Sequence, residues 1–230
     1  MSGNNKTENS RNAENVRGLI KPVEKAVISS QISAQIEQIP NKSGERFKQG
    51  DILVKFDCSF YRADLMSAEA AFNAKKNVYE NNKQLLALNA MSDIDVSIAE
   101  SEMEVARAER SMRAIKVSQC EIKAPYSGRV IEINVNEHEN VPADTELLSI
   151  LNDKELEIEL IVPSTWLTWI KAEETFQFLI DETGETVNAR ISKIGAVVDP
   201  VSQTVKLTGK FTEQPQRVLS GMSGTARFNN

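Results

Sequence analysis

The chain has 230 residues, a formal net charge of −6, and 27 Lys and Arg residues scattered along its length. This pattern argues against a nucleic-acid partner, because binding a polyanion requires a concentrated basic face. The longest apolar runs, such as residues 147–151, are far shorter than the roughly 20 residues needed to cross a bilayer.

The first stretch, residues 1–16, is polar, rich in asparagine and without periodicity, which predicts a disordered lead. It contains no apolar segment of the kind that a signal peptide has, and no membrane anchor is visible. We therefore expect either a cytosolic chain as written or a chain whose targeting segment has been removed.

Residues 17–57 and 121–151 both consist of short β segments separated by turn signals. Each stretch is too short to bury a core by itself. The second repeats the pattern of the first with an offset of 94 residues, so we predict one pseudo-symmetric sandwich built from two halves. The offset superimposes Ser33 on Ser127, Ile36 on Val130, Ile39 on Ile133, Glu45 on Glu139, Phe47 on Val141, Leu53 on Leu147 and Phe56 on Ile150.

Residues 58–120, between the two halves, predict a long antiparallel hairpin of two α-helices. Asn89 suits the end of the first helix, and Ser92 is a good N-cap for the second. Apolar residues recur at heptad spacing in both arms, and we interpret both series as the seam between the helices. The series are Leu65, Phe72, Tyr79 and Leu86 in the first arm, and Ile94, Ile98, Ser101, Val105, Ala108, Met112 and Ile115 in the second.

Residues 152–230 predict a small β-barrel, because several short strands follow one another with one short helix after the first. We expect strands at 155–160, 175–180, 187–194, 204–211 and 224–228, and the helix at 163–170.

The residues that could carry chemistry are too few for an enzyme, and we predict no catalytic, cofactor or metal site. His138 is the single histidine, and its polar surroundings are typical of a loop residue. One histidine and two cysteines do not make a zinc site of the usual spacing. Neither a nucleophile elbow nor a phosphate-binding glycine loop is present.

This order of elements resembles the periplasmic adaptor family, also called membrane fusion proteins, of the HlyD-like and RND efflux type. The resemblance implies a multidomain α+β fold: a split lipoyl-like (biotinyl/lipoyl) β-sandwich with an inserted α-helical hairpin, followed by a small β-barrel. A membrane-proximal domain, usual in the family, has almost no sequence left here. The residues that carry the resemblance are 44–57 with Tyr61, 122–131, 161–163, 194–199 and 219–222.

The resemblance also implies a function, that of a non-enzymatic periplasmic adaptor in a tripartite efflux system. Such an adaptor bridges an inner-membrane transporter, here expected to be of the RND type, and an outer-membrane exit duct. It is attached to the inner membrane and associates with itself into a ring, hexameric in the family.

The hairpin tip of efflux adaptors carries an Arg, a Leu four residues later and a Ser seven residues after that. Here Leu85 and Ser92 take the Leu and Ser places, whereas the Arg place is Asn81. Several apolar residues, among them Leu88, crowd this tip, where local packing is the alternative to partner binding. We predict that Asn81, Leu85, Leu88 and Ser92 dock to the exit duct.

Cys58 and Cys120 stand at the two feet of the predicted hairpin, 62 residues apart, so an antiparallel pair of helices brings them near each other. Two readings stay open: a disulfide that closes a long loop in an oxidising compartment, and two buried free thiols.

Two other functions fit parts of the pattern. One is an adaptor of an ABC-type export or type I secretion system, although such adaptors commonly have much longer hairpins. The other is a lipoyl-type carrier or scaffold, but the tight turn that presents the carrier lysine is replaced here by residues 58–120.

Overall fold

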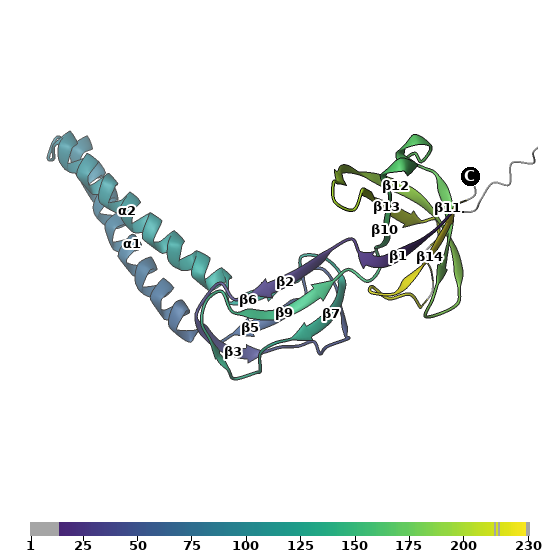
Figure 1. The fold of residues 1–230 in the computed structure, drawn as a ribbon. Helices are drawn as coiled ribbons and strands as arrows, with labels where there is room; N and C mark the ends of the chain where they lie inside the picture. Colours follow the sequence, from purple (N-terminus) through teal and green to yellow (C-terminus); the bar gives the residue numbers. More distant parts are fainter. Residues whose placement is uncertain (1–13, 214, 216, 229–230) are drawn as a thin grey trace, which may run out of the picture. The chain divides into compact units, whose positions relative to one another are not determined.

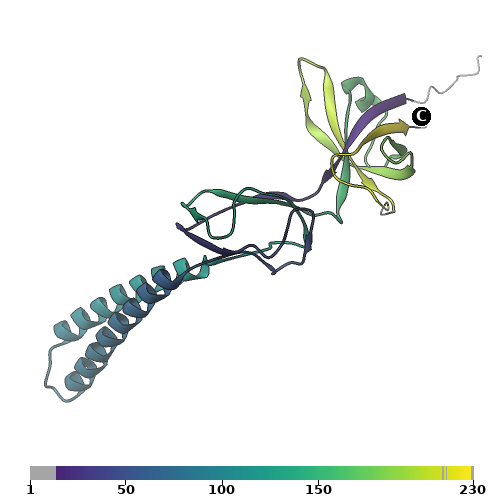
Figure 2. The ribbon, with the colours of Figure 1, turned by 90° about the horizontal axis from the view of Figure 1, so that it is seen from below.

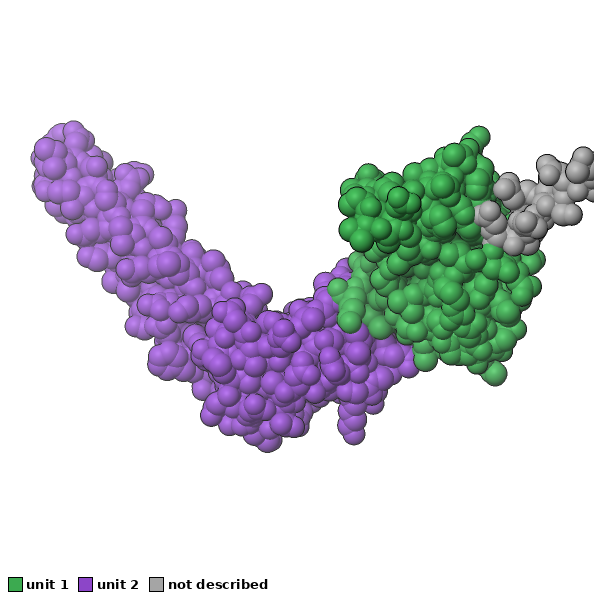
Figure 3. Space-filling model, in the orientation of Figure 1, with its two compact units in different colours: residues 1–25, 151–230 green, residues 26–150 purple. Residues whose placement is uncertain are grey.

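The computed structural model describes residues 14–213, 215 and 217–228, and the chain divides into two compact units (Figures 1 and 3). One unit holds the described residues up to 25 and from 151 onward, and the other holds residues 26–150. The predicted combination of a β-barrel, further β-sheets and two helices is confirmed.

Six strands of the first unit close into a barrel in the order β1-β10-β13-β12-β11-β14. The 3₁₀ helix η1 lies between β10 and β11, where the sequence predicts a short helix. The bounds are β1 Glu14–Pro22, β10 Leu156–Pro163, η1 Ser164–Thr168, β11 Thr175–Ile180, β12 Thr186–Asp199, β13 Thr204–Phe211 and β14 Ser223–Phe228.

Strand β1 corrects a predicted domain boundary. We expected a disordered lead up to residue 16 and the sandwich from residue 17, but β1 pairs with β10 and β14 in the barrel. Residues 1–13 of the predicted lead lie outside the described residues. A short half-buried strand has the same sequence pattern in any sheet, so local pattern does not reveal which sheet it joins. Here β1 covers the open edges of β10 and β14, which would otherwise expose unpaired backbone groups.

Glycines make room for the aromatic side chains inside the barrel. Gly18 and Gly224 are direct cross-strand partners on β1 and β14. A Cβ at Gly224 would lie 2.4 Å from the carbonyl oxygen of Leu179 and 2.6 Å from Cζ of Phe178. A Cβ at Gly18 would lie 2.8 Å from Cε2 of the same ring. The fully buried Phe178 therefore occupies the space that side chains at these two positions would need.

Glu159 on β10 links three strands of the barrel through ion pairs. Its carboxylate lies 2.6 Å from Nζ of Lys21 on β1 and 2.9 Å from Nζ of Lys206 on β13. Hydrogen bonds from Lys206 and then from Lys21 lower the pKa of Glu159 below its ordinary value. The negative charge of Glu159 is thus favoured in the folded barrel.

The second unit contains two four-stranded sheets, in the orders β2-β9-β7-β4 and β6-β5-β3-β8. Their shared core includes the fully buried Ile36, Leu53, Phe56, Leu147 and Ile150. The bounds are β2 Lys25–Ser29, β3 Ala34–Gln38, β4 Arg46–Phe47, β5 Ile52–Phe56, β6 Glu121–Lys123, β7 Gly128–Ile133, β8 Asn140–Val141 and β9 Glu146–Leu151.

The internal repeat of the sequence corresponds to reciprocal pairing in this unit. The Gly44 amide donates to the carbonyl of Val130, and the equivalent His138 amide donates to the carbonyl of Ile36, at 2.8 and 2.9 Å. Both turns need a left-handed backbone, with φ of 84° at Gly44 and 68° at His138. Each half of the repeat therefore pairs with the other half at matching positions.

Between β5 and β6 the chain forms two helices, α1 (Ser59–Ala87) and α2 (Asp93–Ser118), which lie side by side in both views (Figures 1 and 2). Asp57 precedes Cys58, the N-cap of α1, and its Oδ1 accepts the Ser59 amide at 3.0 Å. This bond lowers the pKa of Asp57. The Tyr61 hydroxyl donates to the carbonyl of Ser33 at 3.0 Å and so joins the foot of α1 to the sheets.

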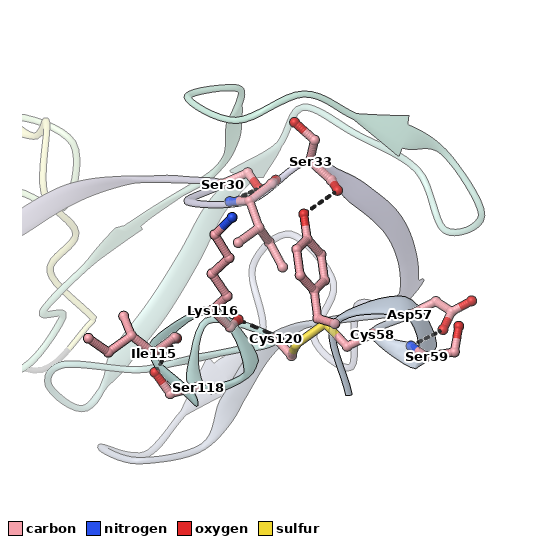
Figure 4. The surroundings of a disulfide bond; sticks show 11 residues. Ser30, Ser33, Asp57, Cys58, Ser59, Ile115, Lys116, Ser118 and Cys120 are labelled. Atoms are coloured by element: carbon pink, nitrogen blue, oxygen red, sulfur yellow. Dashed lines mark hydrogen bonds between the residues drawn. A yellow bond between two sulfur atoms is a disulfide. The ribbon is translucent and has the colours of Figure 1, made fainter. Parts of the chain in front are cut away.

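Cys58 and Cys120 form a disulfide at the feet of the two helices (Figure 4). Their Cα atoms are 6.0 Å apart, and both side chains are buried. The Phe56 amide also donates to the carbonyl of Cys120 at 2.9 Å. The bond and this contact hold the start of α1 against the end of α2.

We expect Gly224→Val to lower the free energy of unfolding of the barrel by about 3 kcal/mol, because the added side chain overpacks the space held by Phe178. Both tryptophans of the chain, Trp166 and Trp169, belong to the barrel unit, so denaturation followed by tryptophan fluorescence measures this unit alone. Ala196→Val, at an exposed position of β12, is the matched control and should leave the midpoint unchanged. Equal midpoints for both variants would contradict the packing argument.

Glu159→Gln should destabilise the barrel by about 1 kcal/mol at neutral pH, the upper range for a solvent-accessible ion pair. Because folding lowers the pKa of Glu159, its contribution is complete above the unfolded pKa and is lost as pH falls through the folded pKa. The difference between wild type and variant should therefore shrink in acid. Glu185→Gln, in the turn between β11 and β12, is the control. A difference that stays constant down to strongly acidic pH would refute this role.

Replacing both Cys58 and Cys120 by serine should lower the stability of the second unit by up to about 4 kcal/mol, the chain-entropy value for a loop of this length. Far-ultraviolet circular dichroism of the helices measures this loss, and tryptophan fluorescence of the barrel serves as the internal control. Native protein that has not been reduced should take up no alkylating label. Labelled thiols in such material would disprove the bond.

Candidate functional site

The tip of the helical hairpin is formed by local hydrogen bonds. Helix α1 ends with Leu88 as its C-cap, and Asn89 follows with a left-handed φ of 55°. The Ala90 amide donates to the carbonyl of Leu85 at 2.8 Å. Ser92 is the N-cap of α2, and its Oγ accepts the Asp95 amide at 3.2 Å. The predicted roles of Asn89 and Ser92 are confirmed, and the turn is closed without help from the sheets.

The four residues predicted to dock lie at this tip, in different surroundings. Asn81 and Leu85 share one face of α1, and the C-cap Leu88 follows them at the same spacing. Asn81 is exposed, Leu85 is half-buried and Leu88 is 74% exposed. The Ser92 hydroxyl also donates to Oδ2 of Asp95 at 2.7 Å, so capping already uses this side chain. Of these four residues, Leu88 is therefore the apolar side chain most available to a partner.

The two helices contact each other through a small apolar core. Phe72 of α1 is buried against Met103 and Ala106 of α2, and Tyr79 packs beside them. The guanidinium groups of Arg107 and Arg110 lie 5.8 and 4.9 Å from the centre of the Phe72 ring. For the first arm, the structure thus places two predicted seam residues, Phe72 and Tyr79, in this core.

For the second arm the predicted seam is wrong. The buried residues of α2 are Ala99, Met103 and Ala106, whereas the five large apolar residues of the predicted series are 53% to 72% exposed. Helix α2 carries two heptad series, and the one with Ala99, Met103 and Ala106 packs against Phe72 and Tyr79. Heptad spacing alone does not show which series faces the partner helix. We call the exposed series the α2 stripe: Ile94, Ile98, Ser101, Val105, Ala108, Met112 and Ile115.

Polar contacts between the two helices define the register of α1 against α2. Lys75 Nζ lies 2.7 Å from the carboxylate of Glu102. The Tyr79 hydroxyl lies 3.4 Å from Oε1 of Glu100. Near the feet, a guanidinium nitrogen of Arg113 lies 3.0 Å from the carboxylate of Asp64. These contacts span residues 64–79 of α1 and so define its register against α2.

The remaining candidate residues lie away from the tip. His138 is in an exposed turn of the two-sheet unit. Cys58 and Cys120 lie at the opposite end of the hairpin. Within residues 14–213, 215 and 217–228, no cluster of three or more metal-binding side chains occurs. The helices described here include none with the length and apolar character of a membrane span.

Comparison with known proteins identifies relatives of this chain. A family model described as the RND MFP barrel-sandwich hybrid domain matches residues 24–153. An uncharacterized protein of Haemophilus influenzae is 28% identical over 220 residues, which cover 93% of this chain and 56% of that protein. The probable efflux pump periplasmic linker protein SepA of Pseudomonas putida is 27% identical over 202 residues, which cover 81% of this chain and 53% of SepA. The chain therefore spans little more than half the length of these curated relatives.

Among solved structures, a MacA–MexA chimeric protein that contains the Pseudomonas aeruginosa MexA α-hairpin domain is similar in fold. The TM-score is 0.83 at 22% sequence identity, and the similarity covers 94% of this chain and 80% of the chimera. The family model covers more than half of the chain, including both halves of the internal repeat and the two helices. The chain belongs to the RND membrane fusion protein family.

Proposed function

We propose that this chain is a non-enzymatic adaptor of a tripartite efflux system and that it works in the periplasm. Membership of the RND membrane fusion protein family and the similarity to a periplasmic linker of an efflux pump support this function. In this proposal the adaptor is attached to the inner membrane. Its partners are an RND transporter of the inner membrane and an exit duct of the outer membrane. A gene for an ABC-type transporter next to the gene for this chain would instead favour an adaptor of an ABC-type export or type I secretion system.

The two-sheet unit, in this proposal, is a lipoyl-like sandwich with the helical hairpin inserted between its halves. The reciprocal bonds of Gly44 with Val130 and of His138 with Ile36 support this assignment, since they relate the two halves by the internal repeat. The inserted hairpin takes the place of a short turn. A helix of 29 residues is about 44 Å long, so the tip is carried far from the sheets.

Copies of the adaptor assemble into a ring, hexameric by family resemblance, in which the hairpins form a tube. One tip offers only a few apolar atoms, so a single adaptor binds the duct weakly. A ring presents several tips at once and binds through avidity.

The observation that carries the docking step is the exposed apolar tip, above all Leu88. An apolar cluster at an exposed end, rather than in a core, is typical of a partner-binding surface. We expect Leu88→Asp and Leu85→Asp to reduce crosslinking to the exit duct at least about tenfold, the effect of about 1.4 kcal/mol of docking energy. The measurement is chemical crosslinking in cells that make the full-length protein.

Met66→Asp is the matched control, because Met66 is on the same helix and is 69% exposed but lies 22 residues from Leu88, toward the foot. Ser92→Arg is a weaker test, since it removes the N-cap and costs about 1 kcal/mol of helix stability. Circular dichroism verifies that each variant is folded. Crosslinking that survives in folded Leu88→Asp and Leu85→Asp, or that is lost equally in Met66→Asp, would refute docking through the tip.

A further inference from the structure

The α2 stripe covers most of the length of α2, and its five large side chains are more than half exposed. We propose that it packs against the outer face of α1 in a second copy of this chain, with both hairpins at the same height. This interface rests on the proposed ring and names the two surfaces and the register that build it.

The stripe has the periodicity of a coiled-coil surface. Its residues follow one another at spacings of four and three, which keeps a helix in contact with a neighbour along its length. The opposite face of α2, with Ala99, Met103 and Ala106, is already occupied by α1 of the same chain. The stripe therefore needs a different helix as its partner.

The outer face of α1 has a complementary surface. It carries mostly small or polar exposed residues, also at heptad spacing, so large side chains of a neighbour can approach its backbone. We call these residues the α1 stripe: Ala63, Ser67, Ala70, Ala74, Asn77, Asn81 and Gln84.

The two stripes match layer by layer when two hairpins stand at the same height. The contacts Lys75–Glu102 and Tyr79–Glu100 define which residues of α1 and α2 are level. By this register each of the five large residues of the α2 stripe meets a smaller or polar one of the α1 stripe, while Ala108 meets Ala70 and Ser101 meets Asn77. The layers are Ile115 with Ala63, Met112 with Ser67, Ala108 with Ala70, Val105 with Ala74, Ser101 with Asn77, Ile98 with Asn81 and Ile94 with Gln84.

Two acidic residues that flank the stripes lie level with uncharged residues of the facing helix. Glu104, beside the α2 stripe, is level with Ala74 and its neutral neighbour Asn73. Glu80, beside the α1 stripe, is level with Ile98. Like charges therefore do not face each other at these two layers.

The positions of the stripes also predict that a row of hairpins curves. In each helix a stripe residue precedes a residue of the hairpin seam by one or two positions, as Ile98 precedes Ala99 by one and Ala70 precedes Phe72 by two. At 3.5 residues per turn, the centre of the stripe and the centre of the seam on the same helix are therefore about 155° apart around the helix axis. Because α1 and α2 are antiparallel, the stripes of both helices are displaced toward the same side of the row of hairpins. The row bends by about 25° per helix and closes after about 14 helices, or seven hairpins, close to the six of the proposed ring.

The test is a disulfide between neighbours in the full chain that carries both Val105→Cys and Ala74→Cys. Both native cysteines are bonded to each other, so the introduced thiols are the only free ones. Each copy offers both halves of the contact, so mild oxidation should give a ladder of multimers on a non-reducing gel. Val105→Cys with Ser67→Cys is the out-of-register control, because Ser67 is on the same stripe but about 10 Å farther toward the foot of α1. It should give no ladder.

The interface is refuted if the in-register variant gives no ladder or if both pairs crosslink equally. Dimers from Val105→Cys alone would mean that two α2 stripes face each other, which also overturns the proposal. Crosslinking of the tip to the exit duct is measured in the same cells. Tip crosslinking without a ladder removes this interface and leaves the adaptor function intact, whereas a ladder without tip crosslinking removes only the docking.

Discussion

The reciprocal pairing of the two halves of the internal repeat is the constraint on which the rest of the second unit depends. Neither half contains enough residues for a core of its own, so Phe56 and Ile150 become buried only when both are present. The last strand before the helices and the first strand after them are neighbours, with Lys55 opposite Glu121 and Val54 opposite Ile122. This pairing places the start of α1 next to the end of α2. The disulfide between Cys58 and Cys120 adds a covalent link there.

The hairpin that leaves this point has little core of its own. Its buried residues in the described chain are Phe72 on α1 and Ala99, Met103 and Ala106 on α2. Much of the remaining contact between the helices is polar, and ion pairs between exposed side chains contribute little stability. Helices of this length owe most of their stability to packing of an apolar face, yet the five large side chains of the α2 stripe are more than half exposed. A hairpin of this composition is therefore best suited to an assembly, where neighbours cover that surface.

The barrel is a discontinuous unit, because its first strand is separated from the next one by the whole of the other unit. Residue 18 of β1 lies opposite Leu160 of β10 and Gly224 of β14, so both ends of the chain are needed to close the barrel. Closure leaves no free edge for unwanted strand pairing. The tryptophans in the barrel and the helices in the other unit give each unit its own spectroscopic signal.

The sequence by itself determined the elements whose pattern is local or strongly periodic. The two helices, the N-cap at Ser92, the internal repeat and the later barrel strands all follow from spacing and turn chemistry. Only the tertiary structure decided which sheet a strand joins and which of two similar helix faces is buried. The strand at residues 14–22 joined the barrel because two open edges were available there. Of the two heptad series on α2, the one with Ala99, Met103 and Ala106 faces α1, where it packs against Phe72 and Tyr79. Periodicity shows that a surface is apolar, whereas packing against the facing helix decides which of two apolar surfaces is buried.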